Sequence, residues 1–490
     1  ALTNLGNAWK QLGRLEDAAA SYRRAIEIKP ELAEVHSNLG TLLLAQDLAE
    51  DAAEGQRKAI AADPDYAVGH TNLGNALKSL KRMDEAAECH ERAIALDPNL
   101  VEAFSNLSTV RQEQGRLEEA ESACRKALAL DPDYAEALCN LGSVLEQQDR
   151  LDEGEAACRR AIDLKPDYAQ AHVNLSLFLF RQGLLQEAWS EYEWRWRMPE
   201  HARALPAFTM PRWDGSPLAG KSILLWAEQG IGDVVRYGTI IPDVAEAGAN
   251  VTIACEDRMA AIFTRSFENA NVMITPHVVG EEAMDAFDFH CPFGGLGPYF
   301  RASHDAFPTS MDGYLKAGPE RVEFWKNRLS EKSSRPKVGL SWSSPMSDPL
   351  RDRYFASIED LAPVLSIEDL DFVNLQSHDC REDIDLAKSF YGADIHTWDD
   401  LDLRNDIEGV AGLTKALDLV ISFPTFGAEF AGALGVPVLC FCYNDNHIDF
   451  LGTGNAVWQP AIQYVTKALD EPWKEVMEDI GRIAREKFSL

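Results

Sequence analysis

A short glycine-rich loop, Gly230-Ile-Gly232-Asp233, carries the residue best suited to acid–base chemistry. The loop follows an apolar run that ends at Trp226 and precedes an amphipathic stretch, so Asp233 is expected at the start of a helix. Because the two glycines lack side chains, a hydroxyl group could approach the Asp233 carboxylate closely and lose its proton to it. Alternatively, Asp233 is an ordinary helix cap, a position where aspartate is favoured.

A second loop, Ser422-Phe-Pro-Thr-Phe-Gly427, joins another apolar run to a helix. Pro424 fits the first turn of that helix, and the main-chain N–H groups that follow it would then face outward and could bind a phosphate group. Hydroxyl, amide and charged side chains near the neighbouring strand ends could contact the same group. The candidate donor-binding residues are Ser341, Ser343, Ser344, Arg351, Arg353, Gln376, Ser422, Thr425, Phe426, Gly427 and Glu429. The two arginines could instead be solvated surface residues.

The elements that must position these loops alternate between strands and helices, which predicts a mostly parallel α/β fold. The expected strands are 222–226, 250–254, 272–274 and 287–291, and then, after a polar stretch at 331–335, 337–342, 371–376, 416–422 and 437–441. Because the alternation of strands and helices begins again after this polar stretch, the sequence predicts two Rossmann-like lobes, 201–330 and 331–490. The final helix, from Pro472 to about Phe488, is long enough to cross back onto the first lobe.

Residues 1–200 form an internal repeat. Prolines recur every 34 residues from Pro30 to Pro166, and leucines keep the same step from Leu5 to Leu175. That period is typical of tetratricopeptide helix pairs, which the small residues and the helix-ending prolines support. The sequence resembles the tetratricopeptide family throughout this region. We therefore expect an α solenoid of six repeats.

One column of the repeat contains asparagine, a mediocre helix former, directly before each repeated leucine. Its members include Asn38, Asn72, Asn106, Asn140 and Asn174. An amide both donates and accepts hydrogen bonds, so the column could hold the main chain of a polypeptide. A similar asparagine ladder in protein O-linked N-acetylglucosamine transferases grips the acceptor. Alternatively, each asparagine bonds a neighbouring repeat.

Several motifs of the second half resemble bacterial repeat-containing proteins with a heptosyltransferase-like GT-B domain. They are Pro-Arg-Trp-Asp-Gly (211–215), Trp-Ala-Glu-Gln-Gly-Ile-Gly-Asp (226–233), Phe-Asp-Phe-His-Cys-Pro (287–292) and Ala-Gly-Ala-Leu-Gly-Val-Pro (431–437). The resemblance implies a GT-B fold of two Rossmann-like lobes, with the acceptor on the first and a nucleotide sugar on the second. It also implies that Asp233 is the catalytic base. A subgroup of such proteins resembles flagellin glycosyltransferases that use a nonulosonic acid.

The second loop departs from the pattern of this family, whose members commonly read Asp-Thr-x-x-x-His. Here Pro424 and Glu429 occupy the corresponding positions. A carboxylate at Glu429 would repel a second phosphate unless it is paired or protonated. The departure favours a donor other than a nucleoside diphosphate sugar, such as a nucleoside monophosphate sugar, or else a decayed site.

Composition excludes several classes of function. The formal charge of −32 repels phosphate backbones and anionic lipids, so nucleic acid and membranes are poor partners. The nine cysteines show no C-x-x-C pair, which argues against a disulfide framework or a structural metal and favours a reducing cytoplasm. No apolar run is long enough to span a membrane.

The sequence therefore predicts a metal-independent protein O-glycosyltransferase, with no cofactor beyond its nucleotide-sugar co-substrate. The repeats would hold a polypeptide acceptor, and the resemblance to the subgroup implies flagellin and a CMP-linked sugar. The alternative is a non-catalytic repeat scaffold with a degenerate GT-B domain. A dinucleotide-dependent oxidoreductase fits less well, because Gly230-Ile-Gly232 lacks the third glycine of that motif.

Overall fold

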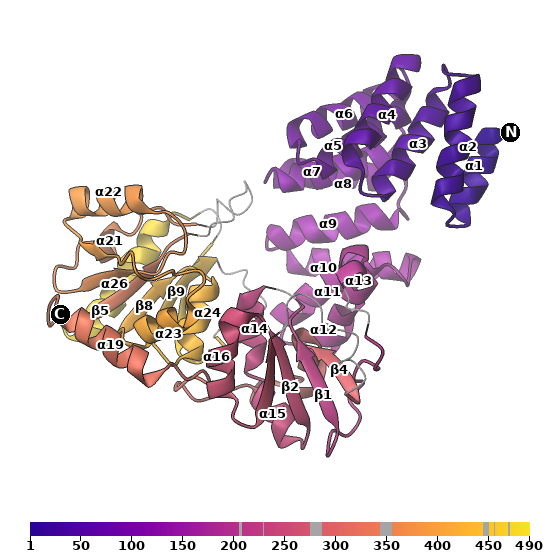
Figure 1. The fold of residues 1–490 in the computed structure, drawn as a ribbon. Helices are drawn as coiled ribbons and strands as arrows, with labels where there is room; N and C mark the ends of the chain where they lie inside the picture. The colour runs from indigo at the N-terminus through magenta and orange to yellow at the C-terminus, as the bar shows by residue number, and fades with distance from the viewer. Residues whose placement is uncertain are drawn as a thin grey trace. The chain divides into compact units, whose positions relative to one another are not determined.

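A computed structural model describes residues 1–204, 208–228, 230–274, 287–343, 355–443, 450–454, 456–468 and 471–490. The chain divides into two compact units, Ala1–Leu175 and Ser176–Leu490. The first unit is helical, and the second contains both parallel sheets (Figure 1).

The first unit is built from antiparallel helix pairs, and a sixth pair continues into the second unit. The helices are α1 (Leu2–Gln11), α2 (Leu15–Ile28), α3 (Ala33–Ala45), α4 (Ala49–Ala62), α5 (Ala67–Ser79), α6 (Met83–Leu96), α7 (Val101–Glu113), α8 (Leu117–Leu130), α9 (Ala135–Gln147), α10 (Leu151–Leu164), α11 (Ala169–Arg181) and α12 (Leu185–Tyr192). The predicted helical repeat is therefore present, with six pairs between Leu2 and Tyr192.

Two local features set the ends of these helices. A residue with positive φ closes the turn inside every pair, and these residues are Gly13, Asp47, Lys81, Gly115, Asp149 and Gly183. Three of the six are not glycine, so the turn is maintained even where the left-handed conformation is costly. Acidic residues such as Asp84 and Glu85 occupy the first turn of the second helix, where they interact favourably with the helix dipole.

Glycines on the first helix of several pairs allow the second helix to pack closely. A Cβ atom on Gly74 would lie 2.6 Å from the ring of His90, which is fully buried. Tyr22, Gln56, Cys124 and Cys158 occupy the same column and are also buried. The column holds large side chains in the first three repeats and cysteines in the next two, and they fill the space between paired helices.

The first lobe of the second unit contains a four-stranded parallel sheet in the order β3-β2-β1-β4. Its elements are β1 (Ser222–Trp226), α14 (Ile231–Gly238), α15 (Ile241–Glu246), β2 (Asn250–Cys255), α16 (Asp257–Ser266), β3 (Ala270–Ile274), β4 (Phe289–Pro292), η2 (Phe293–Leu296) and α18 (Gly297–Phe300). Preceding it are η1 (Glu193–Arg197) and α13 (Pro199–Ala204), and η3 (His304–Ala306) follows. The strands lie where the apolar runs predicted them.

The second lobe contains a six-stranded parallel sheet in the order β10-β9-β8-β5-β6-β7. Its elements are α19 (Pro319–Ser330), β5 (Lys337–Ser341), α21 (Ala362–Leu365), β6 (Asp371–Asn374), α22 (Arg381–Tyr391), β7 (Ile395–His396), α23 (Ile407–Lys415), β8 (Leu419–Ser422), α24 (Phe426–Ala433), β9 (Val438–Tyr443), β10 (Ile462–Lys467) and α26 (Trp473–Phe488). Both sheets together confirm the expected α/β class.

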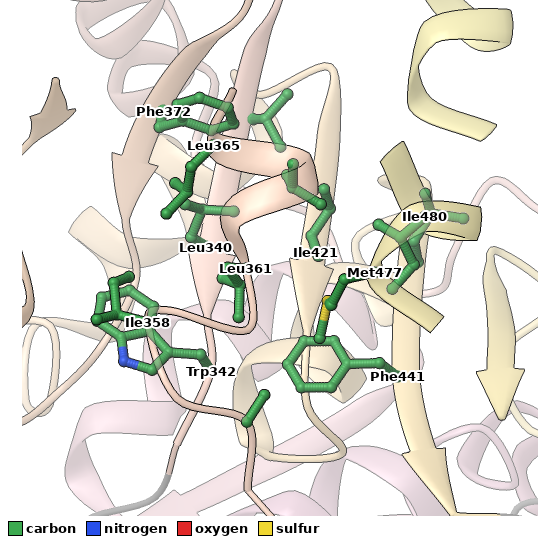
Figure 2. Close-up of a cluster of buried hydrophobic side chains, with 14 of the residues drawn as sticks. Leu340, Trp342, Ile358, Leu361, Leu365, Phe372, Ile421, Phe441, Met477 and Ile480 are labelled. Atoms are coloured by element: carbon green, nitrogen blue, oxygen red, sulfur yellow. The ribbon is translucent and has the colours of Figure 1, made fainter. Parts of the chain in front are cut away.

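The final helix does not pack as predicted. Its apolar face, which includes Met477 and Ile480, belongs to the core of the second lobe with Ile421 and Phe441. Figure 2 shows Met477 beside the ring of Phe441. The helix α26 contacts α21 and β10. The expected crossing onto the first lobe is therefore wrong, because the apolar stripe of α26 is buried within its own lobe.

The structure also places two domain boundaries at positions other than those predicted from the sequence. Helix α19 packs on α23, where a Cβ atom on Gly412 would lie 2.7 Å from Arg321, so residues 319–330 join the second lobe rather than end the first. At the other end, α12 packs on α18 of the first lobe, and Trp189 Nε1 donates to the carbonyl of Arg301 at 2.9 Å. The second unit consequently begins at Ser176, before residue 200.

Candidate functional site

The two predicted loops face one another across the lobes. Helix α14 of the first lobe and α24 of the second lie side by side (Figure 1). A Cβ atom added to Gly232 would lie 4.0 Å from the Cα atom of Phe426. We call the region formed by Gly230, Gly232, Asp233 and residues 425–427 the interlobe site. It follows the carboxyl ends of β1 and β8, where parallel sheets commonly bind ligands.

The fold does not require the glycines of this site. None of Gly230, Gly232 and Gly427 has positive φ. A Cβ atom on Gly230 would meet nothing within 4 Å, and one on Gly427 would make only ordinary contacts, 3.6 Å from Thr425 Oγ1. Neither backbone conformation nor packing explains the missing side chains, whereas close approach of a ligand to the main chain would.

Asp233, Arg236 and Glu429 form a chain of ion pairs that connects the two lobes. Its Oδ1 atom lies 3.6 Å from Arg236 Nη1, one turn further along α14. Arg236 Nη2 in turn lies 2.7 Å from Glu429 Oε1 on α24. The charge on Glu429, which is 6% exposed, is therefore offset by a guanidinium group. This pairing removes the main objection to a phosphate group beside Glu429.

The main-chain donors at the start of α24 are available. Thr425 is the residue before the helix, and its side chain makes no capping hydrogen bond. The first amides that bond within the turn are those of Ala428 and Glu429, both to the carbonyl of Thr425. Among the described residues, the amides of Thr425, Phe426 and Gly427 have no acceptor. The helix start thus presents unbonded main-chain donors, and binding of an anion there stays a prediction.

The predicted serine and glutamine ligands form a buried network at the adjacent strand ends. One amide atom of Gln376 lies 2.8 Å from Ser341 Oγ, and the other lies 2.7 Å from Ser343 Oγ. The amide satisfies all its neighbours when its nitrogen faces Ser341 Oγ and its oxygen faces the Ser343 N–H. Ser422 is fully buried and donates to the carbonyl of Phe423 at 2.7 Å. Ser341, Gln376 and Ser422 therefore support the strand ends from within, and Ser343 is half-buried beside them.

The sequence reasoning missed two residues near this site. Arg236 lies three residues after Asp233, a spacing that places both on one helix face and could have revealed the pair. His378 Nε2 lies 3.3 Å from Ser343 Oγ, just after β6. Three predicted donor ligands, Ser344, Arg351 and Arg353, lie outside the described residues.

A buried ion pair supports the first lobe behind the glycine loop. Arg195 and Glu228 are 1% and 3% exposed at their side chains, and Arg195 Nη2 lies 2.9 Å from Glu228 Oε2. Arg195 also pairs with Glu193 at 2.8 Å, and Glu193 pairs with Arg212. Burial raises the pKa of the Glu228 carboxyl, although Arg195 opposes the shift. Glu228 follows β1 directly, so this network fixes the approach to the loop.

In the repeats, asparagine side chains connect adjacent helix pairs. Asn72 Nδ2 donates to Ser37 Oγ at 3.0 Å, and Asn140 Nδ2 donates to Ser105 Oγ at 3.1 Å. Asn174 Nδ2 lies 3.3 Å from the carbonyl of Cys139. Asn38 makes a longer contact, 3.5 Å, with Asn7, and the described chain offers the Asn106 side chain no hydrogen bond. The geometry favours the inter-repeat alternative for at least three members; acceptor binding stays a prediction.

Three further observations concern the thiols, possible metal ligands and possible membrane spans of the described residues. All nine cysteines are free thiols. No group of three or more His, Cys, Asp or Glu side chains in the described ranges is arranged to hold a metal ion. Within those ranges, no helix combines the length and apolar character needed to cross a bilayer.

Comparison with known proteins supports the repeat assignment. Residues 1–203 match the C-terminal domain of cilia and flagella-associated protein 70. With the observed helix pairs, this match identifies the first unit as a solenoid of tetratricopeptide-like repeats.

One relative extends beyond the repeats. The chain is 33% identical over 317 residues to protein FlbA of Caulobacter vibrioides, covering 62% of this chain and 52% of that protein. The chain therefore spans about half the length of the curated relative that it matches.

The solved structures that are similar to part of the chain include two bacterial proteins. A tetratricopeptide protein of Thermus thermophilus is 24% identical, with 36% of this chain and 97% of that chain covered and a TM-score of 0.34. PilF of Pseudomonas aeruginosa is 23% identical, with 39% and 86% covered and a TM-score of 0.34.

Proposed function

We propose that the chain is a protein O-glycosyltransferase of the GT-B type. The observation that carries the proposal is the interlobe site, where Asp233 follows the glycine that lies beside Phe426, and the main-chain amides of residues 425–427 have no acceptor among the described residues. Asp233 is the proton acceptor and residues 425–427 bind the phosphate of a nucleotide sugar. The absence of side chains at Gly230, Gly232 and Gly427 leaves room for both substrates beside the main chain.

The proposed reaction needs one proton transfer and one displacement. A Ser or Thr hydroxyl oxygen of the acceptor forms a bond to the anomeric carbon of the sugar, while the bond from that carbon to the phosphate oxygen breaks. The hydroxyl proton passes to the Asp233 carboxylate, and the negative charge that develops on the phosphate is stabilised by the amides and dipole of α24. Arg236 holds Asp233 and offsets Glu429, so the leaving phosphate does not face an unpaired carboxylate.

The repeats supply the acceptor in this proposal. Tetratricopeptide solenoids present extended surfaces to polypeptides. The amide nitrogens of Asn72 and Asn140 bond the preceding repeat, and their carbonyl oxygens remain available as acceptors. Flagellin as the acceptor and a CMP-linked nonulosonic acid as the donor belong to the same proposal. They stem from the resemblance of the second unit to the flagellin glycosyltransferase subgroup.

A matched pair of variants tests the catalytic role. Asp233→Asn removes the base, whereas Asp257→Asn removes an exposed carboxylate from the first turn of α16, another helix of the same lobe. We expect Asp233→Asn to lower sugar transfer about 10²- to 10⁴-fold and Asp257→Asn to leave it unchanged. Intact-mass spectrometry of co-expressed flagellin reports transfer, and nucleotide release from CMP-, UDP- and GDP-linked sugars reports donor hydrolysis.

The scaffold alternative predicts a different set of results. If the second unit only supports the repeats, no nucleotide sugar is hydrolysed, no acceptor gains mass, and Asp233→Asn behaves like Asp257→Asn. Equal behaviour of the two variants in an active preparation would also remove Asp233 from the mechanism, even if the protein transfers sugar.

A further inference from the structure

The chain passes from the first lobe to the second through residues 307–318, which we call the connecting segment and which lie between η3 and α19. Within this segment, Tyr314 contacts both helices that carry the interlobe site. Its hydroxyl donates to the carbonyl of Val235 on α14, and its main-chain N–H donates to the carbonyl of Ala433 on α24 at 2.8 Å. One residue therefore joins α14 to α24.

Both carbonyls lie at helix ends that need a partner from outside the helix. The last four carbonyl groups of an α-helix have no N–H donor within it. Val235 is the fourth residue from the end of α14, and Ala433 is the last residue of α24. The N–H of Leu315 also donates to the Ala433 carbonyl, at 2.8 Å. Tyr314 thus helps to cap the C-terminal ends of both helices.

Glycines make room for these contacts. A Cβ atom on Gly238, the last residue of α14, would lie 2.5 Å from the hydroxyl oxygen of Tyr314. A Cβ atom on Gly313 would collide with the carbonyl of Ala433, and one on Gly435 would collide with the main chain of the connecting segment. Because both of these glycines also have positive φ, the two main chains can approach each other closely there.

The Tyr314 hydroxyl keeps its proton and remains a donor. Its ring stacks on Phe267, with the ring centroids 5.7 Å apart, and this contact orients the side chain. Burial raises the pKa of the Tyr314 hydroxyl well above its ordinary 10, and the charge of Glu429 raises it further. The bond to α14 is therefore present throughout the pH range in which a carboxylate can accept a proton from a substrate.

The helices α14 and α24 run in the same direction, and contacts along their length set their spacing. At their N-terminal ends, a Cβ atom on Gly232 would lie 4.0 Å from the Cα atom of Phe426. Further along, Arg236 pairs with Glu429 at 2.7 Å, and the C-terminal ends meet at Tyr314. Of these contacts, those of Tyr314 lie outside the interlobe site, at the other end of the helices.

We propose that Tyr314 is a positioning residue for sugar transfer, whose hydroxyl holds α14, and with it Asp233, at a fixed distance from the start of α24. The inference rests on the proposed function, because it takes Asp233 as the base and α24 as the phosphate-binding helix. The hydroxyl bonds α14 alone, whereas the main chain of Tyr314 bonds α24 alone. Loss of the hydroxyl should therefore displace the base and leave the phosphate donors in place.

A pair of tyrosine variants tests this division of roles. Tyr314→Phe removes the hydroxyl and keeps the ring and the main-chain bonds, whereas Tyr299→Phe removes a hydroxyl from α18 at a residue that is 45% exposed. Nucleotide release from CMP-, UDP- and GDP-linked sugars, with flagellin as acceptor, gives the turnover number. Calorimetry with CMP, UDP and GDP gives the nucleotide Kd.

We expect Tyr314→Phe to lower the turnover number at least about tenfold while the nucleotide Kd stays within about twofold, because only the base is misplaced. Tyr299→Phe should change neither quantity. An unchanged turnover number in Tyr314→Phe overturns the proposal. A loss of turnover that is matched by an equal loss of nucleotide affinity also overturns it, since that result would indicate general damage to the fold.

A second measurement reports the spacing of the helices without turnover. Gly232→Cys combined with Phe426→Cys places two thiols where a Cβ atom and a Cα atom are 4.0 Å apart, which is within reach of a disulfide. Peptide mapping after oxidation follows this disulfide separately from the nine native cysteines. We expect Tyr314→Phe, added to this pair, to slow disulfide formation at least about threefold, and Tyr299→Phe to leave it unchanged.

Equal rates of disulfide formation in the two backgrounds overturn the positioning role, whatever the turnover. If the parent protein releases no nucleotide from any of the sugars, the proposed function fails. The rates of disulfide formation then decide on their own whether the Tyr314 hydroxyl holds α14 against α24.

Discussion

The asparagine column of the first unit and the glycine loops of the second are both regular features of the sequence, yet their polar groups behave differently. Asn72, Asn140 and Asn174 donate to the neighbouring repeat, whereas the amides of residues 425–427 have no acceptor in the described chain. In the first unit, polar groups stabilise the protein by bonding one another. In the second, donors beside open glycines have no partner among the described residues, which the proposed phosphate binding would explain. Substitutions should therefore change stability in one unit and binding in the other.

The largest effect on stability is expected at the buried ion pair Arg195–Glu228 of the second unit. Unlike the amides of residues 425–427, these polar groups have partners, so removing one of them should lower the free energy of unfolding. Glu228→Met leaves Arg195 buried with a single remaining carboxylate partner, and should lower the free energy of unfolding by about 3–5 kcal/mol. Urea unfolding followed by tryptophan fluorescence measures this, because ten of the eleven tryptophans follow Trp9 and lie in the second unit.

The control is the double variant Arg195→Met with Glu228→Met, which removes both charges and should recover part of the loss. Helix unfolding of the repeats, followed by far-UV circular dichroism, should keep its midpoint in both variants. A shift of that midpoint would show that the substitution also destabilises the repeats.

The next effect is pH-dependent and lies in the repeats. Burial lowers the pKa of His90 from its ordinary 6.5 to about 4, and neither ring nitrogen has a partner. The unfolded chain therefore takes up a proton near pH 6.5 that the folded chain resists until about pH 4. Stability contributed by neutral His90 is full above pH 6.5 and falls by about 3 kcal/mol as the pH drops to about 4.

His90→Gln should remove that dependence. Gln56 occupies the same column and donates to the carbonyl of Ser37 at 2.9 Å, so glutamine at position 90 has the equivalent carbonyl of Thr71 within reach. Urea unfolding of both proteins between pH 7 and pH 4 gives the difference in their free energies of unfolding. The two proteins have the same carboxylates, so the pH dependence due to those groups cancels in this difference. Parallel pH profiles for the two proteins would contradict this account.

A smaller effect separates the two explanations of the asparagine column. Asn140→Ala loses a hydrogen bond to the preceding repeat and should cost about 1 kcal/mol. Asn106→Ala loses no hydrogen bond within the described chain and gains helix propensity, so its stability should be unchanged or slightly higher. Pull-down experiments measure how much flagellin each variant binds. An equal loss of flagellin binding by both variants would show that the asparagine column contacts the acceptor.

The smallest change in stability is expected at the glycine loop. Gly232→Ala adds a methyl group whose closest neighbour is 4.0 Å away, and alanine favours the helix by up to about 1 kcal/mol. The variant should be as stable as the parent protein or slightly more stable, yet bind nucleotide sugars more weakly. A destabilised Gly232→Ala protein would mean that the fold, rather than a ligand, requires the glycine.

Much of the fold could be predicted from the sequence because its periodicities are strong. The 34-residue step gave the helix pairs, and apolar runs located most strands to within a few residues; Ser222–Trp226 matches β1 at both ends. The strand β10 was missed, because Ile462–Lys467 is neither a continuous apolar run nor a regular alternation, and it carries a glutamine and a lysine. The direction of α26 could not be predicted, since an apolar stripe does not say which lobe will cover it.

The candidate site was predicted in part. Local motifs identified Asp233 and the start of α24, and the structure brings them together across the lobes. Motifs could not show that Arg236 pairs with Glu429, because those residues lie 193 positions apart. Ser341 and Ser422 have the right residue type at the right strand ends, but tertiary packing buries both hydroxyls.

The central claim is that the amides at the start of α24 bind the phosphate of a nucleotide, and calorimetric titration with CMP, UDP and ADP tests it most directly. Gly427→Asp places a negative charge at the second helical position, where it favours the helix dipole but repels phosphate; Gly427→Asn is the neutral match. We expect the parent protein to bind at least one nucleotide, Gly427→Asp to lose binding at least tenfold more than Gly427→Asn, and both variants to remain folded. No binding of any nucleotide by the parent protein, or equal binding by all three proteins, would contradict it.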